Sequence, residues 1–216
     1  MRQISRLAIL HTMPQVHTPK TFGQRLATRA LGMLGWKAVL EPPPGPKFVA
    51  VGYPHTSNWD FLYAILWKFA TGQPMNWVGK KELFPPVLAP LMKALGGIPL
   101  DRRKKGSEFV SQVAELIRSR EAIVLVVAAE GTRSRAEYWR SGFYYMALGA
   151  QVPIALGYLD YARREVGIGA YLWPSGDIRA DFDKLRAFYA DKVGKKPENA
   201  GPVRLREEVP DLEAKP

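Results

Sequence analysis

From residue 48 onward, short apolar runs alternate with longer stretches of helical periodicity, and this alternation constrains the fold more than any other feature. Five runs have the length and apolar character of buried strands: Phe48–Tyr53, Met75–Val78, Ile98–Leu100, Ile123–Val127 and Ile154–Tyr158. The stretches between them predict helices: Trp59–Ala70, Pro86–Leu95, Ser107–Arg120 and Glu137–Leu148. Because parallel strands need such crossover connections, the sequence predicts an α/β fold with a largely parallel or mixed central sheet flanked by helices.

The remaining segments complete the predicted organisation. Val166–Trp173 predicts an edge strand and Asp181–Lys192 a last helix, while the polar, proline-bearing residues after Gly194 predict a poorly packed end. We therefore expect three parts: a leader with an amphipathic helix over residues 1–40, an α/β domain over 41–194 and a polar tail over 195–216.

The N-terminal part predicts an amphipathic helix over Thr21–Trp36, with Arg25 and Arg29 between apolar side chains at helical spacing. This helix either packs on the domain or lies on anionic lipid with its arginines at headgroup level. No apolar run reaches the roughly 18 residues that span a bilayer. Met1–Met13 is too short and poorly flanked for a signal peptide. We expect a soluble or peripheral protein with no transmembrane span.

Polar and charged residues cluster where the predicted strands end. In an open parallel sheet, ligands bind at the carboxyl ends of the strands. Four segments leave those ends: His55–Asp60, Gly79–Glu82, Asp101–Lys105 and Glu130–Arg135. If the strands are parallel, one edge of the sheet gathers a histidine, carboxylates and many basic groups. The net charge of +11, from 31 basic and 20 acidic residues, also favours an anionic partner.

His55 and Asp60 stand at the junction of a buried strand and a helix. As a helix start, Ser57 or Asn58 is the N-cap and Asp60 favours the first turn, which leaves His55 unexplained. In the second interpretation, Asp60 orients His55, and His55 acts as a general base. The spacing alone leaves both interpretations open.

The sequence lacks the residues that several kinds of site require. The chain has no cysteine and three histidines, which excludes disulfide scaffolds, thiolate metal sites and cysteine nucleophiles. It also has no G-x-S-x-G, no G-x-G-x-x-G and no P-loop. We expect no metal and no cofactor. A histidine base in such a chain would activate a hydroxyl group on a substrate.

The segment Glu130-Gly131-Thr132-Arg133 follows the most hydrophobic strand and suits a phosphate. A glycine lets backbone N–H groups approach closely, and a guanidinium makes two charge-assisted hydrogen bonds. A surface turn with an ordinary ion pair would contain the same residues. Arg102 is the cation nearest its own strand end, and Lys80 is placed similarly.

Together these segments resemble the glycerolipid acyltransferase family, of the 1-acylglycerol-3-phosphate acyltransferase type, in a short and divergent bacterial branch. The resemblance covers about Val49 to Leu156. Four segments are similar to the family's motifs in the right order: His55-x-x-x-x-Asp60, Gly97–Arg102, Glu130–Arg133 and Val152-Pro153-Ile154.

The resemblance implies an O-acyltransferase in which His55 takes the proton of an acceptor hydroxyl while Asp60 steadies His55. The hydroxyl then attacks an acyl thioester without a covalent acyl-enzyme. The implied donor is acyl-CoA or acyl-carrier protein, and the implied acceptor is a membrane lysophospholipid at the cytoplasmic face of an anionic membrane. By the same resemblance a set of residues binds or shapes the phosphate site, namely Arg102, Glu130, Gly131, Thr132 and Arg133, with Ser57, Asn58 and Lys80 in support.

The sequence also departs from the family pattern. Ala128-Ala129 stands where the family usually has an aromatic residue and a proline, so an acceptor without glycerol phosphate stays an alternative. A second alternative is a basic nucleic-acid-binding protein, which needs a basic groove with stacking aromatics. We expect no nucleic-acid partner. Trp139–Phe143 resembles the segment after the third motif, but we interpret it as the start of the next helix.

Overall fold

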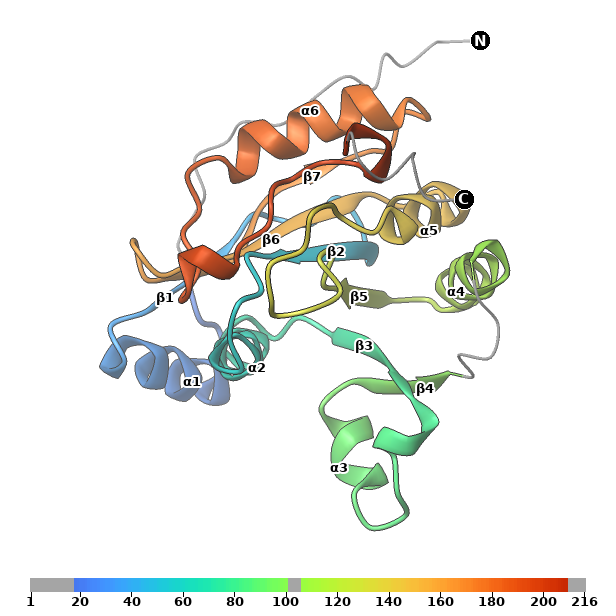
Figure 1. Cartoon of the computed structure of the whole chain (residues 1–216). Coiled ribbons are helices and arrows are strands. Elements are labelled where there is room, and N and C mark those ends of the chain that lie inside the picture. The colour runs from blue at the N-terminus through green and yellow to red at the C-terminus, as the bar shows by residue number, and fades with distance from the viewer. Residues whose placement is uncertain (1–17, 101–105, 210–216) are drawn as a thin grey trace, which may run out of the picture.

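The computed structural model describes residues 18–100 and 106–209. These residues form a seven-stranded mixed sheet with helices on both faces, which confirms the predicted fold class (Figure 1). The strands lie in the order β1-β7-β6-β2-β5-β3-β4. β2 to β6 run parallel to one another, whereas β1 and β7 run the opposite way. The bounds are β1 Lys37–Leu40, β2 Lys47–Tyr53, β3 Met75–Lys80, β4 Gly97–Leu100, β5 Ile123–Val127, β6 Ile154–Asp160 and β7 Glu165–Leu172.

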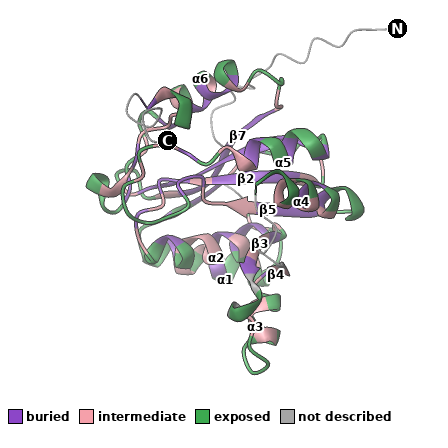
Figure 2. Cartoon of the chain, turned by 45° about the vertical axis from the view of Figure 1, so that its right-hand side comes forward, coloured by how far each residue is buried: buried purple, intermediate pink, exposed green. Residues whose placement is uncertain are grey.

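The helices divide between the two faces of the sheet (Figures 1 and 2). α1 (Phe22–Met33) and α2 (Trp59–Thr71) cover one face. The other face is covered by α4 (Ser107–Ser119), α5 (Gly142–Ala150) and α6 (Ile178–Tyr189). The short helix α3 (Ala89–Ala94) stands beyond β3 and β4 and buries none of its residues. Three 3₁₀ turns complete the described elements: Lys81–Leu83, Pro197–Asn199 and Arg206–Glu208.

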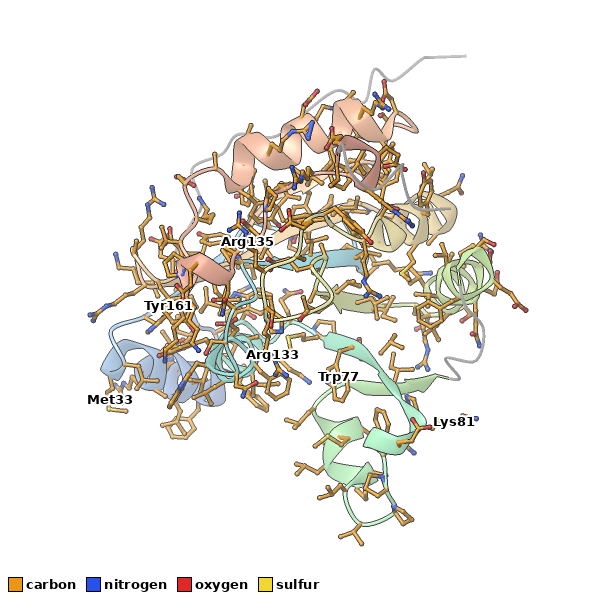
Figure 3. All side chains as sticks on the ribbon, in the orientation of Figure 1. Met33, Trp77, Lys81, Arg133, Arg135 and Tyr161 are labelled. Atoms are coloured by element: carbon orange, nitrogen blue, oxygen red, sulfur yellow. The ribbon has the colours of Figure 1, made fainter. Side chains whose placement is uncertain are left out.

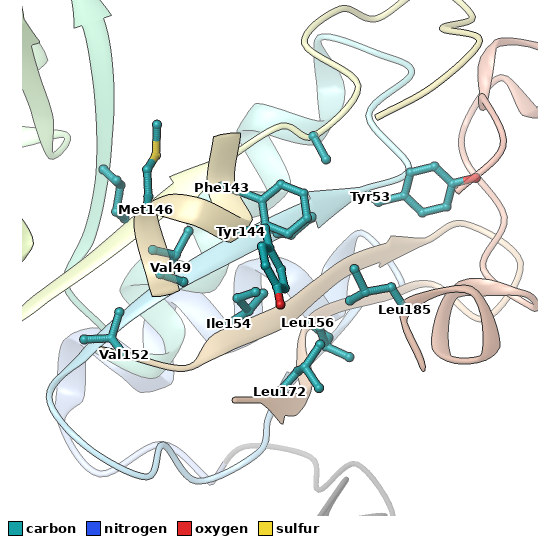
Figure 4. Close-up of a cluster of buried hydrophobic side chains, with 14 of the residues drawn as sticks. Val49, Tyr53, Phe143, Tyr144, Met146, Val152, Ile154, Leu156, Leu172 and Leu185 are labelled. Carbon is teal, nitrogen blue, oxygen red and sulfur yellow. The ribbon is translucent and has the colours of Figure 1, made fainter. Parts of the chain in front are cut away.

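Alternation along the central strand β2 divides the core in two. Val49 and Val51 face the cluster under α4, α5 and α6, and Phe48 and Ala50 face the cluster under α1 and α2. Figure 4 shows Val49 in the first cluster, to which Phe143 of α5 also belongs. Because both faces are buried, β2 has the continuous apolar sequence expected of an inner strand.

Helix α1 packs on the domain through one face only. It begins with a capping box, in which Thr21 Oγ1 accepts from the Gln24 N–H at 3.2 Å and Gln24 Oε1 accepts from the Thr21 N–H at 3.0 Å. Leu31 is fully buried, whereas Phe22 and Met33 are 82% and 83% exposed. Within the described ranges, no helix is both long enough and apolar enough to cross a bilayer.

The strands at the β1 side of the sheet differ in position and number from the prediction. The strand predicted over Val166–Trp173 is β7, but it lies inside the sheet, between β6 and β1. β1 forms the edge and pairs with β7 from Lys37 opposite Glu165 to Leu40 opposite Ile168. A four-residue strand is too short for its periodicity to reveal it. The sheet therefore begins before residue 41, and residues 1–17 of the expected leader lie outside the described residues.

The predicted poorly packed end is wrong for residues 195–209. Leu205 is 2% exposed and Val209 is 8% exposed. The Arg204 carbonyl accepts a hydrogen bond from the Trp139 N–H at 2.9 Å. The Arg204 guanidinium also pairs with Glu137 at 2.8 Å. These contacts join positions far apart in the chain, so no local pattern predicts them.

The helix predicted over Glu137–Leu148 begins later, at Gly142. Trp139 belongs instead to the loop before α5, where it is 1% exposed and packs against the rings of Tyr53 and Tyr189. The interpretation of Trp139–Phe143 as a helix start is therefore wrong for its first residues.

Candidate active site

The loops after β2 and β5 meet at the carboxyl edge of the sheet, because these two strands are neighbours. The first loop carries His55–Asp60 and the second Glu130–Arg135. The predicted convergence is observed for these two segments. Arg102, within Asp101–Lys105, lies outside the described residues, as does the side chain of Lys80.

His55 and Asp60 lie side by side where the β2 loop enters α2. His55 Nδ1 is 3.3 Å from Asp60 Oδ2, and the two side chains are 29% and 2% exposed. With Nδ1 facing the carboxylate, Nε2 is the ring nitrogen left for a ligand. A partly exposed imidazole beside a buried carboxylate is the arrangement of a general base and its orienting group.

The Asp60 carboxylate accepts hydrogen bonds on both oxygens. Oδ2 accepts from the N–H groups of Thr56 and Ser57 at 2.8 and 2.9 Å. Oδ1 accepts from the hydroxyl of Tyr161 at 2.7 Å. Asp60 therefore holds the loop at the start of α2 and faces His55 at the same time. The two interpretations of Asp60, as a residue of the helix start and as the partner of His55, are compatible.

Ser57 and Asn58, both predicted as supporting residues, form hydrogen bonds with different parts of the site. Ser57 Oγ accepts from the Trp59 N–H at 3.3 Å. Asn58 stands at the N-cap position of α2, but its side chain makes no capping hydrogen bond. Instead Asn58 Oδ1 accepts from Arg133 Nη1. This hydrogen bond links the β2 loop to the β5 loop.

Glu130 is buried between two backbone donors. Its Oε2 accepts from the His55 N–H and its Oε1 from the Gly201 N–H, both at 2.9 Å. The Gly201 carbonyl in turn accepts from the Tyr53 hydroxyl at 2.9 Å. Burial raises the pKa of Glu130, and its two backbone hydrogen bonds oppose that rise. Glu130 thus ties the backbone of His55 to the C-terminal segment.

The residues after Glu130 form an exposed turn. Gly131 has φ +68°, a conformation that favours glycine. A Cβ there would lie closest to the side chain of Arg140, which is exposed and can move aside. Thr132 Oγ1 accepts from the Ser134 N–H at 3.2 Å. Arg133 is exposed on this loop (Figure 3). Its guanidinium is accessible to an anion at the edge that carries His55.

A cavity of about 570 Å³ opens beside His55. Thr132 and Arg133 line its polar part. Its apolar part lies between the sheet and the helices α4 and α5, and is lined by Val78, Phe109, Val113, Leu125, Val127 and Met146. A cavity with both polar and apolar walls suits a ligand that has a polar head and a hydrocarbon chain.

Two residues that contact the site were not singled out from the sequence. Tyr161 follows β6, which also ends at the carboxyl edge, so the rule applied to the other strands would have indicated it. Gly201 lies in a segment without periodicity, and only its long-range contact with Glu130 reveals it.

Among the residues that the structure describes, no cluster of three or more histidine, cysteine or acidic side chains has a geometry suited to a metal ion. The chemistry of the described edge is that of an imidazole, carboxylates and guanidinium groups.

Comparison with known proteins gives a family match for the chain. No curated protein matches the chain. The sequence model of the Acyltransferase family matches residues 43–155, just over half of the 216 residues. The matched region contains the His55–Asp60 pair, Glu130 and Arg133. The protein therefore belongs to the Acyltransferase family.

Proposed function

We propose that the protein transfers a fatty acyl group from acyl-CoA or acyl-carrier protein to the hydroxyl of a lysophospholipid such as 1-acylglycerol 3-phosphate. The observation that carries the proposal is the His55–Asp60 pair, whose histidine lines a cavity with both polar and apolar walls. Membership of the Acyltransferase family supports the transfer of an acyl group. The lipid acceptor and the thioester donor are our proposal.

In the proposed reaction, His55 Nε2 takes the proton of the acceptor hydroxyl while Asp60 stabilises the imidazolium that forms. The hydroxyl oxygen bonds to the thioester carbonyl carbon, and the carbon–sulfur bond breaks. The departing thiolate takes the proton from His55, which restores the neutral imidazole. The chain supplies no thiol for a covalent acyl-enzyme, since it contains no cysteine.

The cavity supports binding of the acyl chain. Val113 of α4, Leu125 of β5 and Met146 of α5 line its interior, and His55 lies at its polar end. Burying a methylene group there stabilises the complex by about 0.8 kcal/mol. A chain bound along this cavity would bring its carbonyl carbon close to His55.

Arg133 supports an acceptor that carries phosphate. It is exposed beside the cavity mouth and its hydrogen bond to Asn58 orients it over the β2 loop. Arg102 has the same role by family resemblance only. Because Ala128-Ala129 departs from the family pattern, a lysolipid without glycerol phosphate is the alternative acceptor.

The exposed side of α1 supports a peripheral site on the cytoplasmic face of an anionic membrane. Arg25 and Arg29 are exposed on α1 together with Phe22, Leu26 and Met33. Such a helix lies in the lipid interface with its apolar side chains immersed. The protein should float with vesicles that contain phosphatidylglycerol, and the double variant Phe22→Glu, Met33→Glu should not. Equal flotation of both proteins would contradict this role of α1.

A lipid-product assay tests the proposed reaction. The purified protein is incubated with acyl-CoA or acyl-carrier protein and with 1-acylglycerol 3-phosphate, its dephosphorylated counterpart, or a choline lysolipid. Mass spectrometry then identifies any diacyl product. We expect protein-dependent product with the phosphorylated acceptor. Product only with the dephosphorylated counterpart would support the alternative acceptor without glycerol phosphate. Product only with the choline lysolipid, which keeps the glycerol phosphate as a diester, would contradict 1-acylglycerol 3-phosphate as the acceptor. Thioester hydrolysis without any acylated lipid would contradict acyl transfer.

A further inference from the structure

The hydroxyl of Tyr161 reaches the catalytic pair from a distant part of the chain. Tyr161 follows the end of β6, 101 residues after Asp60, and its hydroxyl donates to Asp60 Oδ1 at 2.7 Å. The other oxygen, Oδ2, faces His55 and the N–H groups of Thr56 and Ser57. The backbone donors therefore hold one carboxylate oxygen and Tyr161 holds the other.

The Tyr161 ring is fixed by aromatic neighbours. Its centroid lies 4.7 Å from Trp36 and 5.9 Å from Tyr63, with both contacts edge-on. Trp36 and Tyr63 stack on each other at 4.0 Å. The Tyr161 N–H also donates to the Val193 carbonyl at 2.8 Å. These contacts leave the hydroxyl little freedom to point anywhere but at Asp60.

The hydroxyl acts as a donor at any pH at which such an enzyme works. Burial is the largest cause that raises the pKa of Tyr161, and the hydrogen bond to Asp60 adds to it. A hydrogen bond to one oxygen draws negative charge toward that oxygen and stops rotation of the carboxylate. It thus keeps Oδ2 directed at His55 and lowers the charge that faces the imidazole.

We infer that Tyr161 is a positioning residue of the acyl-transfer site, which sets the orientation and the charge of Asp60 through a hydrogen bond to Oδ1. The inference rests on the proposed role of His55 as the base. Tyr161 acts through Asp60 and touches no reacting atom.

Other polar groups around the pair are already engaged. From the β5 loop, Glu130 accepts from the backbone of His55 and of Gly201. From the C-terminal segment, the Lys196 N–H donates to Thr56 Oγ1 at 3.2 Å, and Lys195 Nζ lies 4.6 Å from the Trp59 ring centre. Apart from His55 itself, Tyr161 is the described side chain that donates to Asp60, so loss of its hydroxyl should change the titration of His55.

The test is the variant Tyr161→Phe, which keeps the ring against Trp36 and Tyr63. We expect kcat to fall about tenfold, or about 1.4 kcal/mol of barrier, as is reasonable for a hydrogen bond to a charged group. KM should stay close to the wild-type value. With more negative charge facing it, His55 should hold its proton to higher pH, so the acid limb of the pH–rate profile should move upward.

A second readout does not need turnover. The ring signals of His55, assigned by their loss in His55→Ala, are followed by NMR as a function of pH in both proteins. A higher midpoint in Tyr161→Phe supports the inference. An unchanged midpoint overturns it, even if kcat falls, because a purely structural role would not move the titration.

Tyr158→Phe is the matched control. Tyr158 donates to Glu165 Oε2 at 3.3 Å, and its hydroxyl has no contact with Asp60. This variant should leave both the profile and the His55 midpoint in place, and an equal shift in it would overturn the assignment to Tyr161. If the wild-type protein transfers no acyl group, the proposed function fails, while the NMR midpoint still decides whether Tyr161 controls the pair.

Discussion

The carboxyl edge of the sheet has two halves that are built in opposite ways. The dyad half, consisting of His55, Asp60 and Glu130, has two buried carboxylates whose four oxygens all accept hydrogen bonds. The arginine half, consisting of Thr132 and Arg133, is exposed, and among the described residues Arg133 donates to the amide oxygen of Asn58. His55 of the dyad half and both residues of the arginine half line the same cavity.

This difference matches the demands of the two tasks. Proton transfer requires a base held in one geometry, so the dyad half is fixed by groups from several elements. Anion binding requires an accessible cation, and burying an unpaired guanidinium would be costly. We therefore expect changes in the dyad half to lower kcat for every acceptor, and changes in the arginine half to affect phosphorylated acceptors selectively.

Asp60→Asn should have a very large effect. The amide cannot stabilise an imidazolium, and its NH₂ group would meet N–H donors, so kcat should fall about a thousandfold. Acyl transfer is measured with each acceptor, and circular dichroism checks the fold. Asp183→Asn, at a side chain that is 72% exposed on α6, is the matched control and should keep wild-type activity. A loss of less than about tenfold in Asp60→Asn would contradict the role of the buried carboxylate.

Arg133→Ala should distinguish the function of the arginine half from that of the dyad half. For the phosphorylated acceptor, kcat/KM should fall about fiftyfold, the size of a lost hydrogen bond between charged groups. For the unphosphorylated counterpart it should hardly change. Arg179→Ala removes an exposed arginine from α6 and controls for net charge. Equal losses on both acceptors would mean that Arg133 does not recognise phosphate.

Gly201→Ala tests the C-terminal support of the dyad half. A Cβ at this position would lie 2.1 Å from the Ala136 carbonyl oxygen, so the backbone that donates to Glu130 must shift. Such overpacking should lower the free energy of unfolding by about 2 kcal/mol. The displaced Glu130 should lower kcat about tenfold. In Gly45→Ala, where a Cβ would meet no atom within 4 Å, both quantities should stay at wild-type values. An unaltered Gly201→Ala enzyme would show that the C-terminal contact is dispensable.

Glu130 should give the smallest effect, a change in the pH dependence of stability. Its pKa is raised by burial, so over the pH range between its unfolded and folded values the folded state keeps a proton that the unfolded state has lost. The contribution of Glu130 to stability therefore falls as the pH rises through this range. Urea unfolding of wild type and Glu130→Gln at several pH values measures the difference. The excess in free energy of unfolding of the wild type over Glu130→Gln should decrease as the pH rises. A pH-independent excess would show that burial does not raise the pKa of Glu130.

Sequence patterns revealed the parts of the fold that have local signals. The five strands predicted between Phe48 and Tyr158 and the helices α2 and α4 follow from apolar runs and helical periodicity, and the carboxyl-edge rule brought His55 and Glu130 together. The four residues of β1 have no such signal, and pairing with β7 alone makes them a strand.

The contacts that hold the site residues in place were less predictable from the sequence than the site residues themselves. The contacts of Tyr161 with Asp60 and of Gly201 with Glu130 join positions 101 and 71 residues apart. The carboxyl-edge rule applied to β6 would have indicated Tyr161 as a residue near the site, but not its contact with Asp60. Nothing in the local sequence indicates Gly201. The loop before α5 is a similar case, since Trp139 is held there by the rings of the core and not by helical propensity.

The most direct measurement is the rate of acyl transfer by His55→Ala, with a folded protein confirmed by circular dichroism. Because the imidazole is the proposed base in the dyad half, transfer should fall by about four orders of magnitude, to background, for phosphorylated and unphosphorylated acceptors alike. Near-normal turnover by the folded variant would contradict general-base catalysis by His55.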